Sequence, residues 1–213
     1  MRFDDRREAG VLLGQAVAER APVDPLVAAL PRGGVPVGFE VARLLGCDLD
    51  VLVVRKVGVP FQTELAMGAV GERGVVIRNR EVMKAARISG AVFDTVVAAE
   101  VAELESRVAL YRQVAEPIDR AGRTVIITDD GLATGSTALA AIDVARVEGA
   151  REVWVAVPVA PADSVAVVEA RADQMVVLHR PHRFMAVGAW YRDFSQTTND
   201  EVRDLLRRSR QVG

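Results

Sequence analysis

The sequence predicts an α/β protein built on a doubly wound, mainly parallel sheet. Short apolar runs rich in β-branched residues alternate with longer segments of helical character along the whole chain. Half of the residues are hydrophobic, while aromatic residues make up 5%, and this composition suits a Val- and Ala-rich α/β protein better than an all-β one. Strand–helix alternation with buried apolar strands favours parallel strands with helices on both faces of the sheet.

The elements follow in order from these runs. Strands are predicted at 26–30, 50–54, 65–70, 74–77, 124–128, 152–157 and 174–178. Helices are predicted at 6–20, 36–45, 94–114, 137–148, 163–171 and 199–209. At 213 residues the chain is long enough to bury a sizeable core. We therefore expect a single domain over residues 1–213, with its core at about 22–178.

The longest predicted helix, 94–114, carries a regular apolar stripe. Its apolar residues recur at alternating spacings of four and three: Val97, Val101, Leu104, Val108 and Tyr111. Side chains at this spacing share one face of a helix, which indicates packing against another helix or a sheet. Glu103 and Arg107 lie four residues apart on another face, where opposite charges stabilise a helix.

The charge and composition of the chain argue against nucleic-acid and membrane partners. The net charge is −2 and the sequence pI is about 5.8, so no overall field favours nucleic acid. A single cysteine, Cys47, excludes an internal disulfide. The segment Met1–Glu8 is charged and lacks the apolar region of a signal peptide, and no apolar run approaches the ~18 residues of a membrane span. We expect a cytoplasmic protein with neither nucleic-acid nor membrane partners.

The most informative segment runs from Thr124 to Thr137. A β-branched run, Val125–Ile127, is followed closely by two adjacent carboxylates, Asp129 and Asp130, and a loop of small residues leads into a predicted helix. Free backbone N–H groups at a helix N-terminus bind phosphate oxygens, helped by the helix dipole. Carboxylates at the end of a strand accept hydrogen bonds from vicinal hydroxyls or hold a metal. Together these features predict a site for a sugar phosphate.

Two further apolar runs end in groups suited to an anion. After the strand at 26–30 comes Pro31-Arg32-Gly33-Gly34, whose glycines let the backbone approach an anion and whose arginine adds a planar, permanent charge. The strand at 50–54 ends in Arg55-Lys56. Taken singly, these segments also fit a surface turn and a solvated strand end. Ligands of open α/β sheets bind at the carboxyl ends of the strands, where all three segments are predicted to lie.

The acidic segment resembles the phosphoribosyl-pyrophosphate (PRPP) signature of the type I phosphoribosyltransferases. That signature consists of apolar residues, two acids, a small-residue loop and Thr-Gly-x-Thr, which is here Thr134-Gly135-Ser136-Thr137. The segment is not a P-loop, since no Gly-Lys-Ser/Thr follows it. The resemblance implies the fold of that family. It also implies Mg²⁺-dependent transfer of the 5-phosphoribosyl group from PRPP to a nitrogenous acceptor such as a nucleobase, with release of pyrophosphate.

The resemblance also assigns residues. The implied catalytic set is Asp129, Asp130, Arg32 and Lys56, with both acids on ribose hydroxyls or on Mg²⁺, mainly through water. The implied 5-phosphate loop is Gly131, Leu132, Ala133, Thr134, Gly135, Ser136 and Thr137. The implied pyrophosphate ligands are Arg32, Gly33, Gly34, Arg55 and Lys56. Family members often carry a non-proline cis peptide in this loop, which we expect at Arg32–Gly33, and a homodimer is their usual form.

Two peripheral segments remain open to more than one interpretation. The polar segment Arg78–Arg87 and the long helix after it occupy the place of the family's closing loop. The basic residues of this segment either contact pyrophosphate or form a solvated cluster: Arg78, Arg80, Lys84 and Arg87. A hood over the acceptor is expected from about 1–10 and 179–213, with Phe3 and 6–8 completing it. Its aromatic residues Trp190, Tyr191 and Phe194 either stack on the acceptor or pin the chain end to the core.

The sequence leaves the acceptor and the activity open. Hypoxanthine-guanine members carry an acid in the loop where this chain has Ala133, which disfavours a 6-oxopurine acceptor. A PRPP-binding regulator without transferase activity is the main alternative. A scaffold role, or a different reaction in the same pocket, is another. His179 and His182 have a spacing that metals use, but no cysteine or third histidine joins them.

Overall fold

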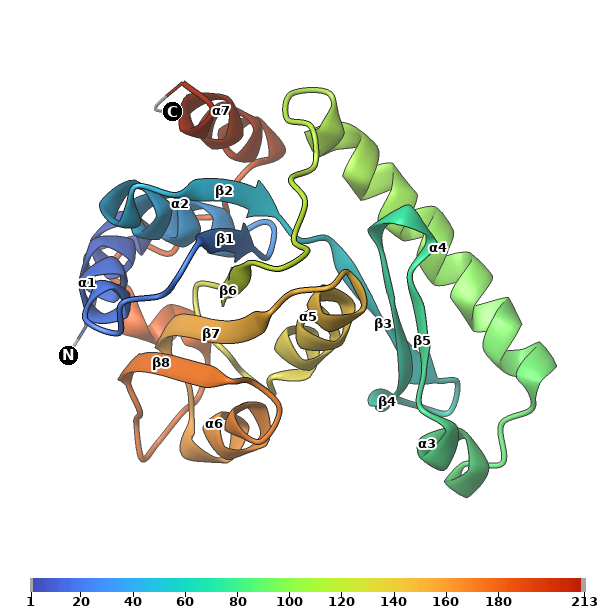
Figure 1. Cartoon of the computed structure of the whole chain (residues 1–213). Helices are drawn as coiled ribbons and strands as arrows, with labels where there is room; N and C mark the ends of the chain where they lie inside the picture. The colour runs from blue at the N-terminus through green and yellow to red at the C-terminus, as the bar shows by residue number, and fades with distance from the viewer. Residues whose placement is uncertain (1, 212–213) are drawn as a thin grey trace.

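A parallel sheet of five strands forms the centre of the computed structural model, which describes residues 2–211. The strand order is β2 (Asp48–Val51), β1 (Pro25–Ala29), β6 (Thr124–Thr128), β7 (Glu152–Val159) and β8 (Gln174–His179). On one side lie α1 (Arg6–Ala18), α2 (Gly34–Leu45) and α7 (Asn199–Ser209), and on the other lie α5 (Ser136–Val147) and α6 (Ala162–Glu169) (Figure 1). The doubly wound parallel sheet predicted from the sequence is confirmed.

Both faces of this sheet are buried, which explains why its strands are continuous apolar runs. Val27 and Ile126 pack into the core beneath α1 and α2, while their neighbours Ala28 and Ile127 pack against α5. Alternate residues of one strand thus enter different cores, as the two-residue period of a strand requires.

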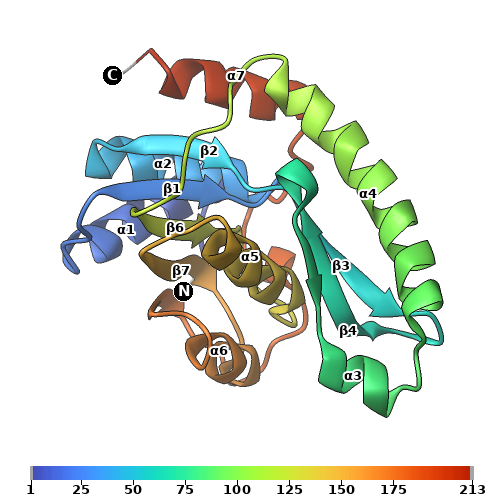
Figure 2. The ribbon, with the colours of Figure 1, turned by 45° about the vertical axis from the view of Figure 1, so that its right-hand side comes forward.

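A second, antiparallel sheet lies beside the first. It consists of β3 (Val54–Val59), β4 (Gln62–Gly71) and β5 (Val76–Arg78). The helix α4 (Gly90–Arg112) runs along it, and α5 lies between the two sheets (Figures 1 and 2). A short 3₁₀ turn, η1 (Glu72–Gly74), joins β4 to β5.

The boundaries of this second sheet correct one prediction. The strand predicted at 50–54 ends at Val51, and β3 begins at Val54 in the other sheet. Arg55 and Lys56 therefore lie within β3 and not at the end of a parallel strand. The chain bends between the two strands at Leu52 and Val53. Both residues are buried like their neighbours, so the sequence shows no break in the apolar run at the bend. Apolarity reports burial and does not report a change of direction.

The segment predicted as a polar loop is partly helical. Arg78 ends β5, and α3 (Arg80–Ala85) follows, capped by the Asn79 side chain, which accepts a hydrogen bond from the backbone N–H of Val82. The long helix begins at Gly90, where the Ser89 hydroxyl caps it, and not at residue 94. Side-chain caps of this kind satisfy the free N–H groups of a first helical turn.

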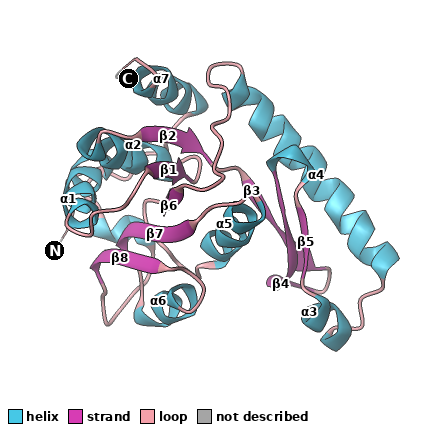
Figure 3. Cartoon of the chain, in the orientation of Figure 1, coloured by secondary structure: helices cyan, strands magenta, loops and turns pink. Residues whose placement is uncertain are grey.

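The N-terminal residues lie against the segment around Tyr191, whereas the C-terminal helix α7 lies apart from them, beside α2 (Figure 3). Phe3 forms an isolated parallel bridge with Tyr191, next to the 3₁₀ turn η2 (Val187–Trp190). Of the segments predicted as a hood, the part around Tyr191 lies against residues near Phe3, whereas α7 packs on α2, α4 and β2. The hood over the acceptor stays a prediction, and residues 1, 212 and 213 lie outside the described part of the chain. No helix within 2–211 has the length and apolarity needed to cross a bilayer.

Candidate functional site

The acidic loop and the Pro31–Gly34 loop meet at the carboxyl edge of the central sheet. A side chain on Gly33 would collide with the Asp130 carboxylate, and one on Gly34 would meet the Thr128 carbonyl oxygen at 2.5 Å. Because β1 and β6 are parallel neighbours, their carboxyl ends bring these loops together. Glycine at these two positions is therefore a requirement of packing.

The two acids lie side by side in a partly buried setting. The Asp129 carboxylate accepts a hydrogen bond from the backbone N–H of Asp130 at 2.8 Å. Burial raises the pKa of Asp129 well above its usual value, and the charge of Asp130 raises it further. Burial also raises the pKa of Asp130, which Arg6 lowers in part. Such a pair is suited to hydroxyl donors or a cation, which compensate the charge.

Arg6 of α1 is the cationic partner of Asp130. Its Nε donates to Asp130 Oδ2 at 2.8 Å, and the two side chains are 12% and 14% exposed. Its Nη1 donates to the carbonyl oxygen of Ser195, and its guanidinium lies 3.9 Å from the ring centre of Phe194. Arg6 therefore joins the start of the chain, the acidic loop and the C-terminal segment.

The predicted 5-phosphate loop has the geometry of an anion site. Gly135, with a φ of 76°, precedes α5 as its N-cap, a left-handed conformation that favours glycine. Within residues 2–211, several of its backbone N–H groups have no acceptor: those of Gly131, Ala133, Thr134, Gly135 and Thr137. The Leu132 N–H donates to the Val159 carbonyl instead, and the Ser164 hydroxyl donates to the Ala133 carbonyl at 2.6 Å. Free N–H groups thus gather at the start of α5.

The other predicted anion loop differs in one detail. The non-proline cis peptide lies at Pro31–Arg32, one bond before the expected Arg32–Gly33. The sequence predicts which loop contains the cis peptide but not which bond, because Pro31–Arg32 and Arg32–Gly33 both precede a non-proline residue.

A cavity of about 500 Å³ borders both loops. Pro31 and Thr137 line it from the two loops, Arg55, Lys56 and Glu64 from the β3–β4 hairpin, and Glu100 and Arg107 from α4. Arg55 Nε contacts Glu100 Oε2 at 2.7 Å, with both side chains about one quarter exposed. Lys56 Nζ lies 3.3 Å from Glu64 Oε2, whose side chain is 80% exposed. Both predicted cations thus face one cavity, although Arg55 is the more firmly held.

The hood aromatics divide into packing and accessible rings. Tyr191 is 1% exposed, lies between Phe3 and Phe194, and donates its hydroxyl to the Asp130 carbonyl at 2.6 Å. Phe194 is 37% exposed. Trp190 is half-buried, with its ring centre 4.6 Å from that of His179. Tyr191 therefore holds the hood on the acidic loop, and acceptor stacking stays a prediction for Trp190 and Phe194.

The basic residues of the expected closing segment lie elsewhere. Arg78 pairs with Asp94 and lies 4.7 Å from the ring centre of Phe93. Arg80, Lys84 and Arg87 are exposed, and none of the four lines the cavity described above. The arrangement favours the solvated-cluster interpretation.

Sequence reasoning missed or underused three residues of this region. Arg6 was expected only as part of a general N-terminal contribution to the hood. Arg107 was interpreted as a surface partner of Glu103, and Glu100 was not singled out. Helical spacing alone gives Arg107 and Glu100 no special status, because which face of α4 meets β3 is a tertiary property. No group of three or more His, Cys, Asp or Glu suited to a metal occurs within 2–211.

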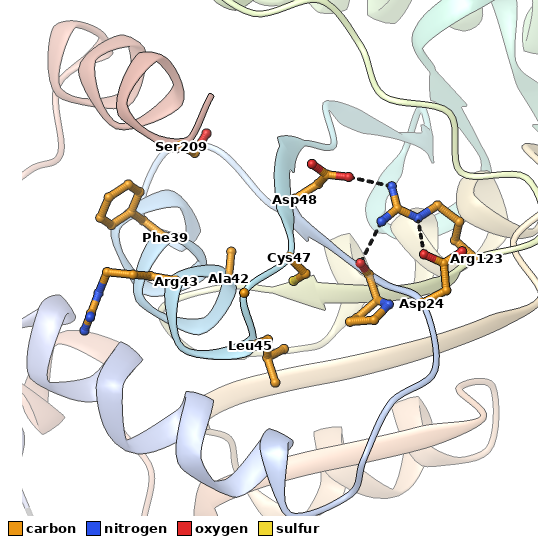
Figure 4. Close-up of a pocket in the computed structure, with 11 residues that line it drawn as sticks. Asp24, Phe39, Ala42, Arg43, Leu45, Cys47, Asp48, Arg123 and Ser209 are labelled. Atoms are coloured by element: carbon orange, nitrogen blue, oxygen red, sulfur yellow. Dashed lines mark hydrogen bonds and ion pairs between the residues drawn. The ribbon is translucent and has the colours of Figure 1, made fainter. Parts of the chain in front are cut away.

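A second cavity, of about 330 Å³, lies at the opposite edge of the sheet, beside the starts of β1 and β2. Figure 4 shows Arg123 between Asp24 and Asp48, to which it is ion-paired at 3.2 and 2.8 Å. Cys47 also lines this cavity, and burial raises its pKa to about 11. The charges here are already paired, and the predicted site residues lie at the other edge.

Comparison with protein families matches residues 15–187 to the family described as Phosphoribosyl transferase domain. Two curated proteins of Mycobacterium tuberculosis, from strains CDC 1551 and H37Rv, are 48% identical to the chain over 207 residues, 97% of its length. Their names assign them to the phosphoribosyl transferases without a confirmed activity. The chain spans about half the length (47%) of these relatives.

Solved structures agree with this match. The TT1426 protein from Thermus thermophilus has a TM-score of 0.93 at 44% identity, covering 98% of this chain and 99% of its own. The AQ2163 protein from Aquifex aeolicus has a TM-score of 0.51 at 11% identity, covering 86% of this chain and 78% of its own. At so low an identity the second similarity concerns the fold alone.

Proposed function

Since the chain belongs to the phosphoribosyl transferase domain family, we propose that it transfers the 5-phosphoribosyl group of PRPP to a nitrogenous acceptor, releasing pyrophosphate. One observation carries the proposal. The acid pair Asp129-Asp130, a helix N-terminus with free N–H groups and a cavity lined by cations all lie at the carboxyl edge of the central sheet. A sugar bearing a phosphate at one end and a pyrophosphate at the other matches this set of groups.

The chain's own groups bind and orient this substrate. The free N–H groups within 131–137 hold the 5-phosphate at the start of α5, and Arg32, Gly33, Gly34, Arg55 and Lys56 form the pyrophosphate side. The acids accept hydrogen bonds from the two ribose hydroxyls. Cleavage at the anomeric carbon places positive charge on the sugar and negative charge on pyrophosphate. Fixed carboxylates and cations at these two places stabilise both charges without reorganisation.

Mg²⁺ belongs to this proposal, and the residues present fit it. Mg²⁺ keeps several waters and binds through one or two carboxylates together with substrate phosphates, and Asp129 and Asp130 supply two carboxylates but no protein cage. When bound, the ion would neutralise charge on the pyrophosphate. The acids would hold it mainly through water.

The hood and α4 keep water from the reacting sugar, and the acceptor enters beneath the hood. Trp190 and Phe194 offer rings to a planar base, and Ala133 leaves the phosphate loop without an acid that could handle a proton on the acceptor. We propose a nucleobase other than a 6-oxopurine. The proposal also places the protein in the cytoplasm as a homodimer of single domains.

The first experiment measures PRPP binding by calorimetry with and without Mg²⁺, followed by pyrophosphate release over a panel of bases and amines. We expect Mg²⁺-dependent binding and release with at least one acceptor. Asp130→Asn should reduce turnover at least about 100-fold with an unchanged circular dichroism spectrum. Asp204→Asn, at an exposed site on α7, is the matched control. Binding without release across the panel would favour the PRPP-binding regulator, and absence of binding would exclude both.

A further inference from the structure

The cationic cavity has a wall that the PRPP signature does not include. Val96, Glu100 and Arg107 of α4 line it together with Lys56 and Pro31. In the views of Figures 1 and 2, α4 runs along the small antiparallel sheet and continues past it toward α7. This helix occupies the place where a closing loop was expected, so its anchoring decides what it can do.

Both ends of α4 are anchored. Near its start, Phe93 is fully buried, and Gly68 of β4 leaves the room for its ring. Leu104 and Tyr111 are buried further along. At its end, Arg112 donates to Asp50 at 2.7 Å and to Glu72 at 2.8 Å, and both acids are buried. A helix held by buried rings and buried ion pairs at both ends opens only at a high free energy.

Among the cations of this cavity, Arg107 is the one on α4, and it is weakly held. Its contact with Glu103 is 3.2 Å long, and both side chains are about half exposed. Exposed pairs of this kind contribute about 0–1 kcal/mol, so a polyanion can replace Glu103 at little cost. Arg55 is different, because its shorter pair with Glu100 joins β3 to α4.

Arg107 lines the same cavity as Pro31, the residue before Arg32. Burial raises the pKa of Tyr111, and the charges of Arg32 and Arg107 both lower it in part. Both guanidinium groups therefore lie near one phenol, although one lies after β1 and the other on α4. Two neighbouring cations raise the positive potential at this edge of the cavity.

We propose that Arg107 is a pyrophosphate-binding residue and that α4 is a fixed wall of the site instead of a closing lid. This inference rests on the proposed function. A guanidinium and an ammonium group, Arg107 and Lys56, would then both bind the diphosphate in this cavity. Arg55 and Glu100 hold the wall in place.

Arg107→Gln tests the residue. We expect the Kd for PRPP and for inorganic pyrophosphate, each with Mg²⁺, to rise about tenfold, since one charged hydrogen bond is lost. The Kd for ribose 5-phosphate, which lacks the diphosphate, should stay within about twofold of wild type. Arg80→Gln, which removes an exposed cation of α3, should leave all three constants unchanged. Glu103→Gln should not weaken any of them.

Hydrogen exchange tests the wall. Amides of 93–111 should already be protected in the free protein and change little when PRPP and Mg²⁺ are added. Exchange that is fast in the free protein and slow with PRPP would establish a lid and overturn this part.

Unchanged pyrophosphate binding by Arg107→Gln, or an equal loss for ribose 5-phosphate, would overturn the role of Arg107 while the proposed function stands. A wild-type protein that binds neither PRPP nor pyrophosphate would remove both proposals.

Discussion

Asp129 is a residue at which stability and ligand binding oppose each other. Its pKa is raised by burial and by Asp130. A carboxyl group with a raised folded pKa adds stability while it is protonated, below its unfolded pKa of about 3.9, and that stability is lost as the pH rises through the folded pKa. Ionisation of Asp129 in the free protein therefore costs stability, and a ligand that compensates the charge offsets this cost.

Asp129→Asn should separate the two effects. We expect the free energy of unfolding at pH 7 to rise by about 1 kcal/mol, because the amide keeps the contact with the Asp130 N–H and removes the buried charge. The difference from wild type should shrink as the pH is lowered toward 4. Urea unfolding at several pH values measures this, and calorimetry should show PRPP binding weakened at least about tenfold. A variant less stable than wild type at pH 7 would contradict the account.

At the scale of elements, a buried charge cluster attaches the second sheet and α4 to the central sheet. Asp50 of β2 is fully buried and accepts hydrogen bonds from Arg112 at 2.7 Å and from Arg120 at 3.1 Å. The two arginines reach Glu72 at 2.8 Å and Glu148 at 2.9 Å in turn. Buried charges are tolerated when each has partners, and removal of one leaves the others uncompensated.

Asp50→Asn should therefore destabilise the protein strongly. We expect a loss of about 3 kcal/mol in the free energy of unfolding, since two buried guanidinium groups lose their shared acid. Asp48→Asn on the same strand is the control. Its partner Arg123 is bonded at an exposed site, so the loss should be below about 1 kcal/mol. Equal losses in urea unfolding would show that the cluster has no special role.

At the scale of the whole molecule, the two chain ends close on the acidic loop. Arg6 bonds Asp130 from the N-terminal side, and Tyr191 bonds the Asp130 carbonyl from the C-terminal side. Val187 of the hood lies against Gly131, where a side chain would meet it at 2.7 Å. Asp130 and the segments around Arg6 and Tyr191 are therefore one packed unit.

Arg6→Gln should loosen that unit. We expect a loss of about 2 kcal/mol in stability, because Asp130 is left without its cation, and PRPP binding about tenfold weaker. Arg7→Gln is the control, since that side chain is 78% exposed. In the double variant with Asp130→Asn, most of the lost stability should return, because no unpaired carboxylate remains. Urea unfolding of wild type, Arg6→Gln, Asp130→Asn and the double variant completes a double-mutant cycle. Purely additive losses of stability would refute the coupling between Arg6 and Asp130.

The sequence predicted the central sheet well and predicted that both candidate anion loops lie at its carboxyl edge. Buried parallel strands must be apolar runs, and the acids and glycines after them are local features of the chain. It also predicted strands close to β4 and β5 but missed β3 and the separate sheet, because the bend at Leu52-Val53 lies inside an apolar run that is buried throughout. The bond that carries the cis peptide was predicted one residue late for a similar reason, since composition does not separate neighbouring peptides.

By itself, then, the sequence determined the class of the fold, the order of its central elements and the position of the acidic loop after a buried strand. These depend on periodicity and on residues that are neighbours along the chain. Only the tertiary structure decided that Arg6 partners Asp130, that Arg55 is bonded to Glu100, and that Arg107 faces the cavity. The residues of the first two pairs lie 124 and 45 positions apart. Contacts at such separations follow from how helices and sheets pack, which no local pattern records.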